Sequence, residues 1–186
     1  MEQDTPDFWV FAYGSLIWQP DFAHLEVRPA RLGGYHRAMC ILSTIYRGTP
    51  ERPGLVLGLD RGGSCRGRAF RVAAAEAEAV RAMLHEREMV TRVYLPRMVA
   101  VRLDDGGRVP ALAFIADRSH AQYFPAGDPA RAAALIRQGV GKAGASRDYL
   151  SRTVASLAEM GVTDRGLRRL LELVEGERPP PAAASS

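Results

Sequence analysis

A glutamate at the end of a predicted helix is the first candidate for chemistry in this sequence. Residues 73–88 contain neither Gly nor Pro and are rich in Ala and Glu, which predicts a helix. The apolar positions recur at helical spacing, at Ala77, Val80 and Leu84. The next position on that face is Glu88, whereas Glu86 points nearly the opposite way. Because burial raises the pKa of a carboxyl group, a Glu88 on the buried face suits a general base that works near neutral pH.

A structural interpretation of Glu88 remains open at this point. A glutamate at a helix end can reach solvent along its aliphatic stem, or pair with an arginine such as Arg92. Helical spacing alone does not separate these two roles.

A glycine turn after an apolar strand is the second candidate. Residues 8–13 form an aromatic and β-branched run of strand length, which breaks abruptly at Gly14-Ser15 before Leu16. Glycine there allows a turn with positive φ, or allows a ligand to approach bare peptide N–H groups. Ser15 adds a hydroxyl at the same point. The simpler interpretation is a strand that ends in a tight turn.

Other motifs carry less chemistry. The segment from Gly139 to Gly144 matches G-x-G-x-x-G, but a predicted helix precedes it where a dinucleotide site requires a strand. A helix–helix turn is therefore expected there. The histidines share no short metal-ligand spacing, and no G-x-S-x-G elbow marks a serine hydrolase. Cys40 and Cys65 are expected to be free, part-buried thiols in a reducing cytosol.

The elements that must position these residues indicate an α+β domain. From residue 26 to about 70 the pattern is β-like, with turns expected at Gly33-Gly34, residues 47–54 and residues 61–64. Several short strands at this spacing predict a small closed or strongly curled β-barrel. Residues 94–103 and 109–116 return to β-structure around the hairpin turn at residues 104–107.

The last third of the chain is predicted to be helical. Asp128 can cap a helix that has Pro129 at its first position. Ser146 and Thr163 are expected to cap the two helices that follow. We expect one domain over residues 1–176 and a disordered Pro- and Ala-rich tail over residues 177–186.

Composition narrows the classes of partner. The chain has 186 residues, a formal net charge of +4 and scattered arginines without a basic block, which disfavours nucleic-acid binding. The start of the sequence lacks a signal-peptide pattern, and no apolar run reaches the length of a membrane span. A cytoplasmic protein that acts on a small molecule, without membrane contact, is expected. The oligomeric state does not follow from the sequence.

Four motifs in order make the chain resemble the ChaC-like γ-glutamylcyclotransferases. The first is the segment W-V-F-A-Y-G-S-L-I-W-x-P-D-F from Trp9, and the second is G-Y at Gly34 with Y-R-G-T-P-E-x-P-G-L from Tyr46. The third is R-E-M-V-T-x-V-Y from Arg87, and the fourth is S-R-D-Y-L from Ser146. The similarity extends from about residue 8 to residue 160.

This resemblance implies a β-barrel with surrounding helices and an enzyme that cleaves a γ-glutamyl amide, with glutathione as the expected substrate and 5-oxoproline and Cys-Gly as products. It implies no metal and no organic cofactor. By motif match the catalytic glutamate falls on Glu88 and the anion-binding loop on Tyr13, Gly14, Ser15 and Leu16.

Tyr149, one turn into its predicted helix, is expected to hydrogen-bond the γ-glutamyl head. A core aromatic whose hydroxyl is satisfied by the backbone is the alternative. For the whole protein, the alternatives are a cyclotransferase for another γ-glutamyl amine or amino acid, and a non-catalytic module that binds a small anion.

Overall fold

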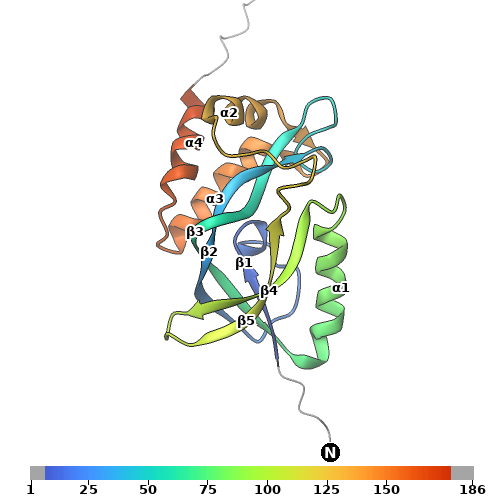
Figure 1. Cartoon of the computed structure of the whole chain (residues 1–186), viewed down its shortest axis with the longest axis vertical. Coiled ribbons are helices and arrows are strands. Elements are labelled where there is room, and N and C mark those ends of the chain that lie inside the picture. The colour runs from blue at the N-terminus through green and yellow to red at the C-terminus, as the bar shows by residue number, and fades with distance from the viewer. Residues whose placement is uncertain (1–6, 177–186) are drawn as a thin grey trace, which may run out of the picture.

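A closed five-stranded barrel forms the centre of the molecule in a computed structural model that describes residues 7–176 (Figure 1). The strands are β1 (Phe8–Ala12), β2 (Glu26–Ser43), β3 (Gly54–Val72), β4 (Tyr94–Leu103) and β5 (Arg108–Ala116). Their order is β1-β3-β2-β4-β5. Parallel pairing of β5 with β1 and β3 closes the barrel, and the other neighbours are antiparallel.

Helices surround this barrel and confirm the predicted α+β class. A 3-10 turn, η2 (Ala74–Glu76), leads into α1 (Ala77–Glu88), which lies along one side of the barrel, while the C-terminal helices cover the other side (Figure 1). Those helices are α2 (Pro129–Gln138), α3 (Ser146–Glu159) and α4 (Arg165–Gly176). The short strands β6 (Val140–Gly141) and β7 (Gly144–Ala145) form the turn between α2 and α3. The turn expected at the glycine-rich segment is therefore present as a tight hairpin.

The expectation of several short strands between residues 26 and 70 is wrong. Two long strands, β2 and β3, run past both glycine pairs that were expected to end strands. Gly34 has φ +82°, and Gly62 and Gly63 have φ +100° and +68°, and the β2–β3 register shifts at Gly33/Tyr35. Glycine tolerates positive φ without a Cβ clash. The two strands can therefore bend and twist at these glycines while the backbone hydrogen bonds between β2 and β3 continue. The expected loop between β2 and β3 is confirmed at residues 44–53.

Apolar side chains fill the barrel interior, as expected for a barrel of this size. Consecutive strand residues such as Val10 and Phe11 are both buried, so parts of the outer face are covered too. Fully buried members include Val10, Phe11, Leu57, Leu59 and Val101. Val80 and Leu84 pack α1 onto the barrel through the predicted apolar face. The helix phase that directs Glu88 inward is thus set by these two contacts.

Two of the three predicted helix caps are wrong. Asp128 does cap α2, because its Oδ1 accepts the Arg131 N–H at 3.0 Å. Ser146 is instead the first residue of α3, and its hydroxyl bonds Leu55 of β3. Asp164, not Thr163, precedes α4 and caps it, because its Oδ1 accepts the Leu167 N–H at 3.1 Å. Ser146 does not cap α3 because its hydroxyl is bound to Leu55 of another element. Thr163 does not cap α4 because the carboxylate of Asp164 is the better acceptor.

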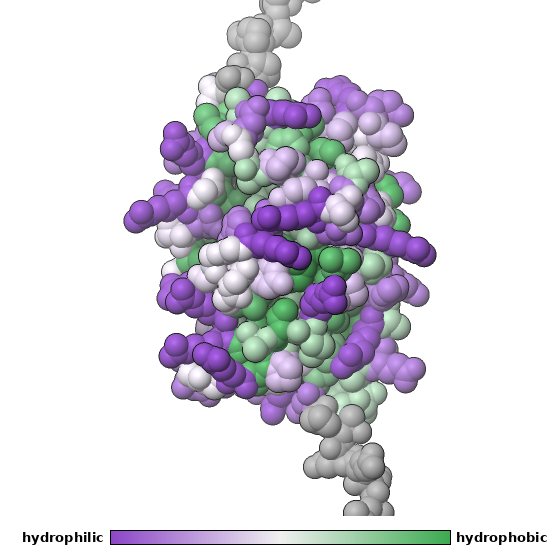
Figure 2. All heavy atoms as spheres, viewed as in Figure 1, coloured by the Kyte–Doolittle hydropathy of each residue, from purple (hydrophilic) through white to green (hydrophobic). Residues whose placement is uncertain are grey.

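Hydrophilic side chains are spread over the whole face of the molecule seen in Figure 2, with hydrophobic ones between them. Within residues 7–176 no helix is both long and apolar enough to cross a membrane. The predicted disordered tail at residues 177–186 lies outside the described residues.

Candidate active site

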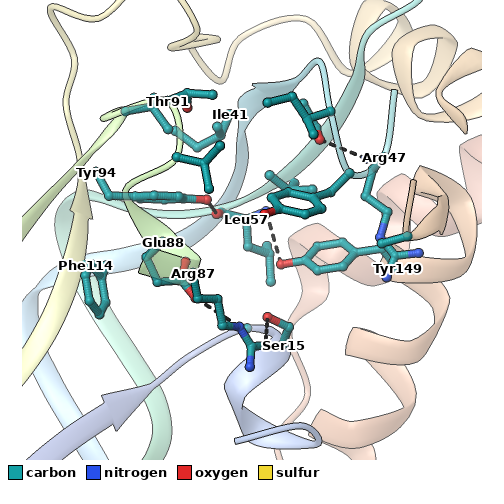
Figure 3. Close-up of a pocket in the computed structure, with 18 of the residues that line it drawn as sticks. Ser15, Ile41, Arg47, Leu57, Arg87, Glu88, Thr91, Tyr94, Phe114 and Tyr149 are labelled. Carbon is teal, nitrogen blue, oxygen red and sulfur yellow. Dashed lines mark hydrogen bonds and ion pairs between the residues drawn. The ribbon is translucent and has the colours of Figure 1, made fainter. Parts of the chain in front are cut away.

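A cavity of about 350 Å³ opens at one end of the barrel and brings together every residue that the sequence singled out for chemistry. Its wall combines the turn after β1, the end of α1, the loop between β2 and β3, and the start of α3 (Figure 3). Its volume lies within the range typical of small-molecule sites. The lining residues from the predicted set are Tyr13, Gly14, Ser15, Leu16, Glu88 and Tyr149.

Glu88 occupies the last position of α1 and directs its carboxylate into the cavity (Figure 3). Its side chain is 17% exposed, so it does not extend freely into solvent. Burial raises the pKa of Glu88 above the ordinary glutamate value of 4.5, and the neighbouring Arg87 charge lowers it by a smaller amount. Glu86 is exposed, as its helix phase predicted. The structural alternative, a pair with an arginine, is present, but the partner is Arg87 at 3.5 Å and not Arg92.

Arg87 ties the end of α1 to the turn after β1. Its guanidinium donates to the Ser15 hydroxyl at 3.1 Å and to the Gln19 carbonyl at 2.9 Å, and it pairs with Asp21 at 3.0 Å. These contacts fix the position of Glu88 relative to Ser15 across 72 residues of sequence. The Ser15 hydroxyl is therefore an acceptor for Arg87, and Arg87 is held by three hydrogen bonds and by ion pairs with Asp21 and Glu88.

The turn after β1 continues directly into the 3-10 helix η1 (Ser15–Ile17). The Ile17 N–H donates to the Gly14 carbonyl at 2.9 Å, and the first N–H groups of the helix have no partner within it. Gly14 has φ −132°, so the expectation of positive φ there is wrong. The approach of a ligand to the bare N–H groups stays a prediction. The structure adds another reason for glycine, because a Cβ at this position would lie 3.1 Å from the Tyr149 hydroxyl oxygen. The β position of residue 14 faces Tyr149 of α3 and Leu57 of β3, which accounts for the glycine.

Hydrogen bonds of Tyr13 hold the same turn to the barrel strands. Its hydroxyl donates to the Phe114 carbonyl at 2.8 Å, and its own carbonyl accepts from Arg37 Nε at 2.5 Å. Arg37 is 7% exposed and also donates to the Arg66 carbonyl, so it joins β1, β2 and β3 behind the turn. The phenol ring of Tyr13 is thus part of the cavity wall, with its hydroxyl already committed to β5.

Tyr149 reaches the cavity from the first turn of α3. Its hydroxyl accepts the Leu57 N–H at 3.4 Å, and its ring packs edge-on against Trp18 at 5.8 Å between centroids. The alternative of a backbone partner is thus present, through a long bond that uses the oxygen only as an acceptor. Burial raises the pKa of Tyr149, which keeps the hydroxyl proton in place for donation. Tyr94 also lines the cavity, and its hydroxyl donates to the Leu57 carbonyl at 2.7 Å.

Metal and thiol chemistry find no support among the described residues. Across residues 7–176, no three His, Cys, Asp or Glu side chains gather in a way that could hold a metal ion. Cys40 and Cys65 are free and buried, and burial raises the pKa of Cys40 to about 12 and that of Cys65 to about 11. Both thiols are therefore inert at neutral pH.

Three cavity residues escaped the sequence-based prediction. Arg87, Tyr94 and Arg47 all line the cavity, and all three lie inside the quoted motifs, with Arg87 directly before Glu88. Tyr94 closes the R-E-M-V-T-x-V-Y segment and Arg47 belongs to Y-R-G-T-P-E. The motif was thus the available signal, but the distant partners that give these side chains their position could not be read from it.

The fold and site define the class of protein to which this chain belongs. A family model described as ChaC-like protein matches residues 8–177, and the chain is a member of that family. The resemblance carried by the four motifs is therefore confirmed.

Particular relatives share this similarity over most of their length. A glutathione-specific gamma-glutamylcyclotransferase of Escherichia coli (strain K12) is 37% identical over 172 residues, which cover 92% of this chain and 74% of the relative. The glutathione-specific gamma-glutamylcyclotransferase 1 of Homo sapiens is 31% identical over 153 residues, which cover 80% and 69%.

Solved structures confirm the fold. The crystal structure of a selenomethionine-labelled gamma-glutamylcyclotransferase specific to glutathione from yeast aligns with a TM-score of 0.85. It is 24% identical and covers 93% of this chain and 97% of the yeast chain. At this identity the structural likeness establishes the barrel with its helices, as the sequence predicted.

Proposed function

We propose that this protein is a γ-glutamylcyclotransferase that cleaves glutathione to 5-oxoproline and Cys-Gly. The observation that carries the proposal is Glu88, a buried carboxylate with a raised pKa in the wall of a cavity built from the family's motifs. Membership of the ChaC-like family and the names of the curated relatives support glutathione as the substrate.

The reaction needs few groups from the protein. The α-amine of the γ-glutamyl residue attacks its own γ-carbonyl carbon, so ring closure is intramolecular and positioning contributes much of the rate. The C–N bond to the cysteine nitrogen then breaks. The α-ammonium loses one proton and the leaving nitrogen gains one, so a single carboxylate can perform both transfers in sequence.

Glu88 takes the role of this carboxylate. As a carboxylate it accepts the proton from the α-ammonium, and as a carboxylic acid it returns that proton to the leaving amine. Because the pKa of Glu88 is raised, it lies closer to neutral pH than the pKa of an exposed glutamate, so Glu88 can both accept and return a proton. Arg87 holds the end of α1 to the Ser15 turn and so acts as a positioning residue.

The turn at residues 13–16 takes the role of anion binding. The N–H groups at the start of η1 belong to residues that line the cavity, and they would donate to the substrate α-carboxylate or to the oxyanion of the tetrahedral intermediate. The Tyr149 hydroxyl, beside Gly14, donates to the γ-glutamyl head.

Product formation from three substrates tests the proposal. The purified protein is incubated with glutathione, γ-Glu-Ala and γ-Glu-ε-Lys, and 5-oxoproline is measured over time. Release from glutathione, well above release from the other two, is expected. Release from γ-Glu-Ala or γ-Glu-ε-Lys but not from glutathione would indicate a cyclotransferase for a different γ-glutamyl substrate. The absence of 5-oxoproline with all three would contradict the enzyme assignment.

A further inference from the structure

Arg47 is the one cavity-lining cation that remains available to a ligand among the described residues. The charged residues of the wall are Asp21, Arg47, Arg87 and Glu88. Arg87 is engaged by Asp21, Ser15 and the Gln19 carbonyl, and it lies 3.5 Å from Glu88. Arg47 has no carboxylate within ion-pair distance in residues 7–176, and its guanidinium donates only to the Ala145 carbonyl, at 3.3 Å.

The guanidinium of Arg47 lies over the ring of Tyr149, 5.4 Å from the centroid (Figure 3). The hydroxyl of the same tyrosine points the other way, toward Leu57 and the side of the cavity that holds Glu88 (Figure 3). Tyr149 thus lies between the proposed reacting centre and Arg47. A substrate whose scissile amide lies at the hydroxyl has its leaving group directed past the ring toward Arg47.

A second feature shows that the Arg47 position is built rather than incidental. The Arg47 N–H donates to the Ser43 hydroxyl at 3.0 Å. Directly before Arg47, the Ile45 and Tyr46 carbonyls accept from the N–H groups of Lys142 and Ala143, at 2.9 and 2.8 Å. The loop that carries Arg47 is therefore held by backbone hydrogen bonds to the β6–β7 turn.

The glycines of that turn explain why the loop can be held so closely. A Cβ at Gly141 would lie 2.5 Å from the Ile45 carbonyl oxygen, and one at Gly139 would lie 2.5 Å from the Arg47 carbonyl oxygen. Gly144 has φ +100°, and a Cβ there would lie 3.2 Å from an Arg47 guanidinium nitrogen. The G-x-G-x-x-G match, which fails as a nucleotide site, thus provides the close backbone packing that fixes Arg47.

We infer that Arg47 binds the carboxylate at the far end of the leaving group, the glycine carboxylate of the Cys-Gly portion, and so selects tripeptide over shorter γ-glutamyl substrates. An extended dipeptide spans about 7 Å, which suits the distance past one tyrosine ring. A guanidinium matches a carboxylate with two parallel hydrogen bonds, and burial strengthens this interaction. The inference rests on the proposed function and names the substrate feature that the same site recognises.

The test compares glutathione with its glycinamide, which lacks only the terminal carboxylate. For the unaltered protein, kcat/KM should be about 10- to 100-fold higher with glutathione, the loss expected when one charged hydrogen-bonding partner is removed. Arg47→Met should lower kcat/KM for glutathione by a similar factor and leave the glycinamide within a few-fold. Arg47→Lys, which keeps the charge but not the planar fork, should recover part of the preference.

Arg131→Met provides the matched control, because Arg131 also lies 5.4 Å from an aromatic centroid, that of Phe124, but outside the cavity. It should leave both substrates unchanged. Equal losses on the two substrates in Arg47→Met, or no preference in the unaltered protein, would overturn the inference.

Equilibrium binding to Glu88→Gln protein, with Arg47 present or replaced, gives a readout independent of turnover. The preference for glutathione over the glycinamide should appear only with Arg47 present. Binding with this preference but without 5-oxoproline release from the unaltered protein would reject the proposed reaction and leave the Arg47 site standing. Binding without the preference would reject the site whether or not the reaction occurs.

Discussion

Gly14 and Tyr149 meet so closely that a β carbon on residue 14 would lie 3.1 Å from the tyrosine hydroxyl oxygen and 3.4 Å from a Leu57 methyl carbon. The turn after β1 and the first turn of α3 therefore share one small volume at the cavity wall. Tyr149 cannot keep its hydroxyl at this point if residue 14 carries a branched side chain, because Leu57 is fully packed on the other side.

Gly14→Val should fold and lose activity. The two γ carbons of valine would displace the Tyr149 hydroxyl and the N–H groups of η1, and a misplacement of about 1 Å can cost roughly 10²-fold in rate. We expect kcat/KM to fall by about that factor, measured by 5-oxoproline release. Gly127→Val, at an exposed loop position with open space for a side chain, is the control and should change nothing. Normal kinetics in folded Gly14→Val would remove the turn from the mechanism.

Tyr149→Phe separates a binding hydroxyl from a merely packed ring. The ring contacts with Trp18 and Arg47 are retained, so the free energy of unfolding should fall by about 1 kcal/mol at most, for the long bond from Leu57 N–H. If the hydroxyl donates to the γ-glutamyl head, kcat/KM should fall about tenfold or more. A variant with altered thermal stability and unaltered kinetics would identify Tyr149 as a core aromatic only.

The inward phase of Glu88 was predictable because it depends on local helix geometry alone. Three apolar positions at helical spacing specify a face, and the barrel accepts that face through Val80 and Leu84. The motif then selected the turn at Tyr13 and the aromatic at Tyr149. All of these depend on short stretches of sequence or on their resemblance to a family.

The failures of prediction share a different cause, which is dependence on distant partners. Arg87 and Arg47 looked like ordinary surface arginines because Ser15 and Ala145 lie 72 and 98 residues away from them. A serine before a helix reads as a cap, yet Ser146 uses its hydroxyl on β3, 91 residues earlier. No local pattern contains these contacts.

Strand register also gathers charges that appear scattered in the sequence. Arg31 on β2 lies directly opposite Arg66 on β3 and opposite Arg102 on β4. Directly paired residues share one face of a sheet, so these three exposed arginines lie on the same outer face of the barrel. Since like charges in such pairs are destabilising, this cluster could not have been anticipated from favourable pairing rules.

Ser146→Ala should destabilise the protein through β3 rather than through α3. The hydroxyl donates to the Leu55 carbonyl at 2.6 Å and accepts the Leu55 N–H at 3.1 Å, and both partners are buried. Leaving buried backbone groups without partners costs about 1–3 kcal/mol, which denaturant unfolding would measure. Ser151→Ala, on the exposed face of the same helix, should stay within about 0.5 kcal/mol of the unaltered protein. A similar small effect at Ser146 would show that the two hydrogen bonds contribute little.

The raised pKa of Glu88 predicts a stability difference that grows with pH. Burial makes the folded state bind the Glu88 proton more readily than the unfolded state, so stability from this group is complete below the ordinary value of 4.5 and is lost as pH rises through the folded-state pKa. Glu88→Gln cannot ionise and lacks this loss. The free energy of unfolding of Glu88→Gln, relative to the unaltered protein, should therefore increase from pH 4 to pH 8. A flat difference between Glu88→Gln and the unaltered protein would refute the raised pKa of Glu88.

The kinetic comparison of Glu88→Gln with Glu86→Gln tests the mechanism most directly. Glutamine is nearly isosteric with glutamate and keeps hydrogen-bonding capacity, but it cannot take a proton from the α-ammonium. Positioned proton transfer contributes roughly 10²–10⁴-fold, so Glu88→Gln should lose at least about that much in kcat, with glutathione binding preserved because the turn at residues 13–16 is untouched.

Glu86 is the matched control, since it lies two residues earlier on the exposed side of the same helix. Glu86→Gln should stay within a few-fold of the unaltered protein in every parameter. Both variants are assayed for 5-oxoproline release beside a binding isotherm for intact glutathione. If Glu86→Gln were inactive and Glu88→Gln normal, the proton transfer would belong to the outward face of α1. If both were active, no carboxylate of this helix would act as the base, and the cavity would have to activate the α-amine by positioning alone.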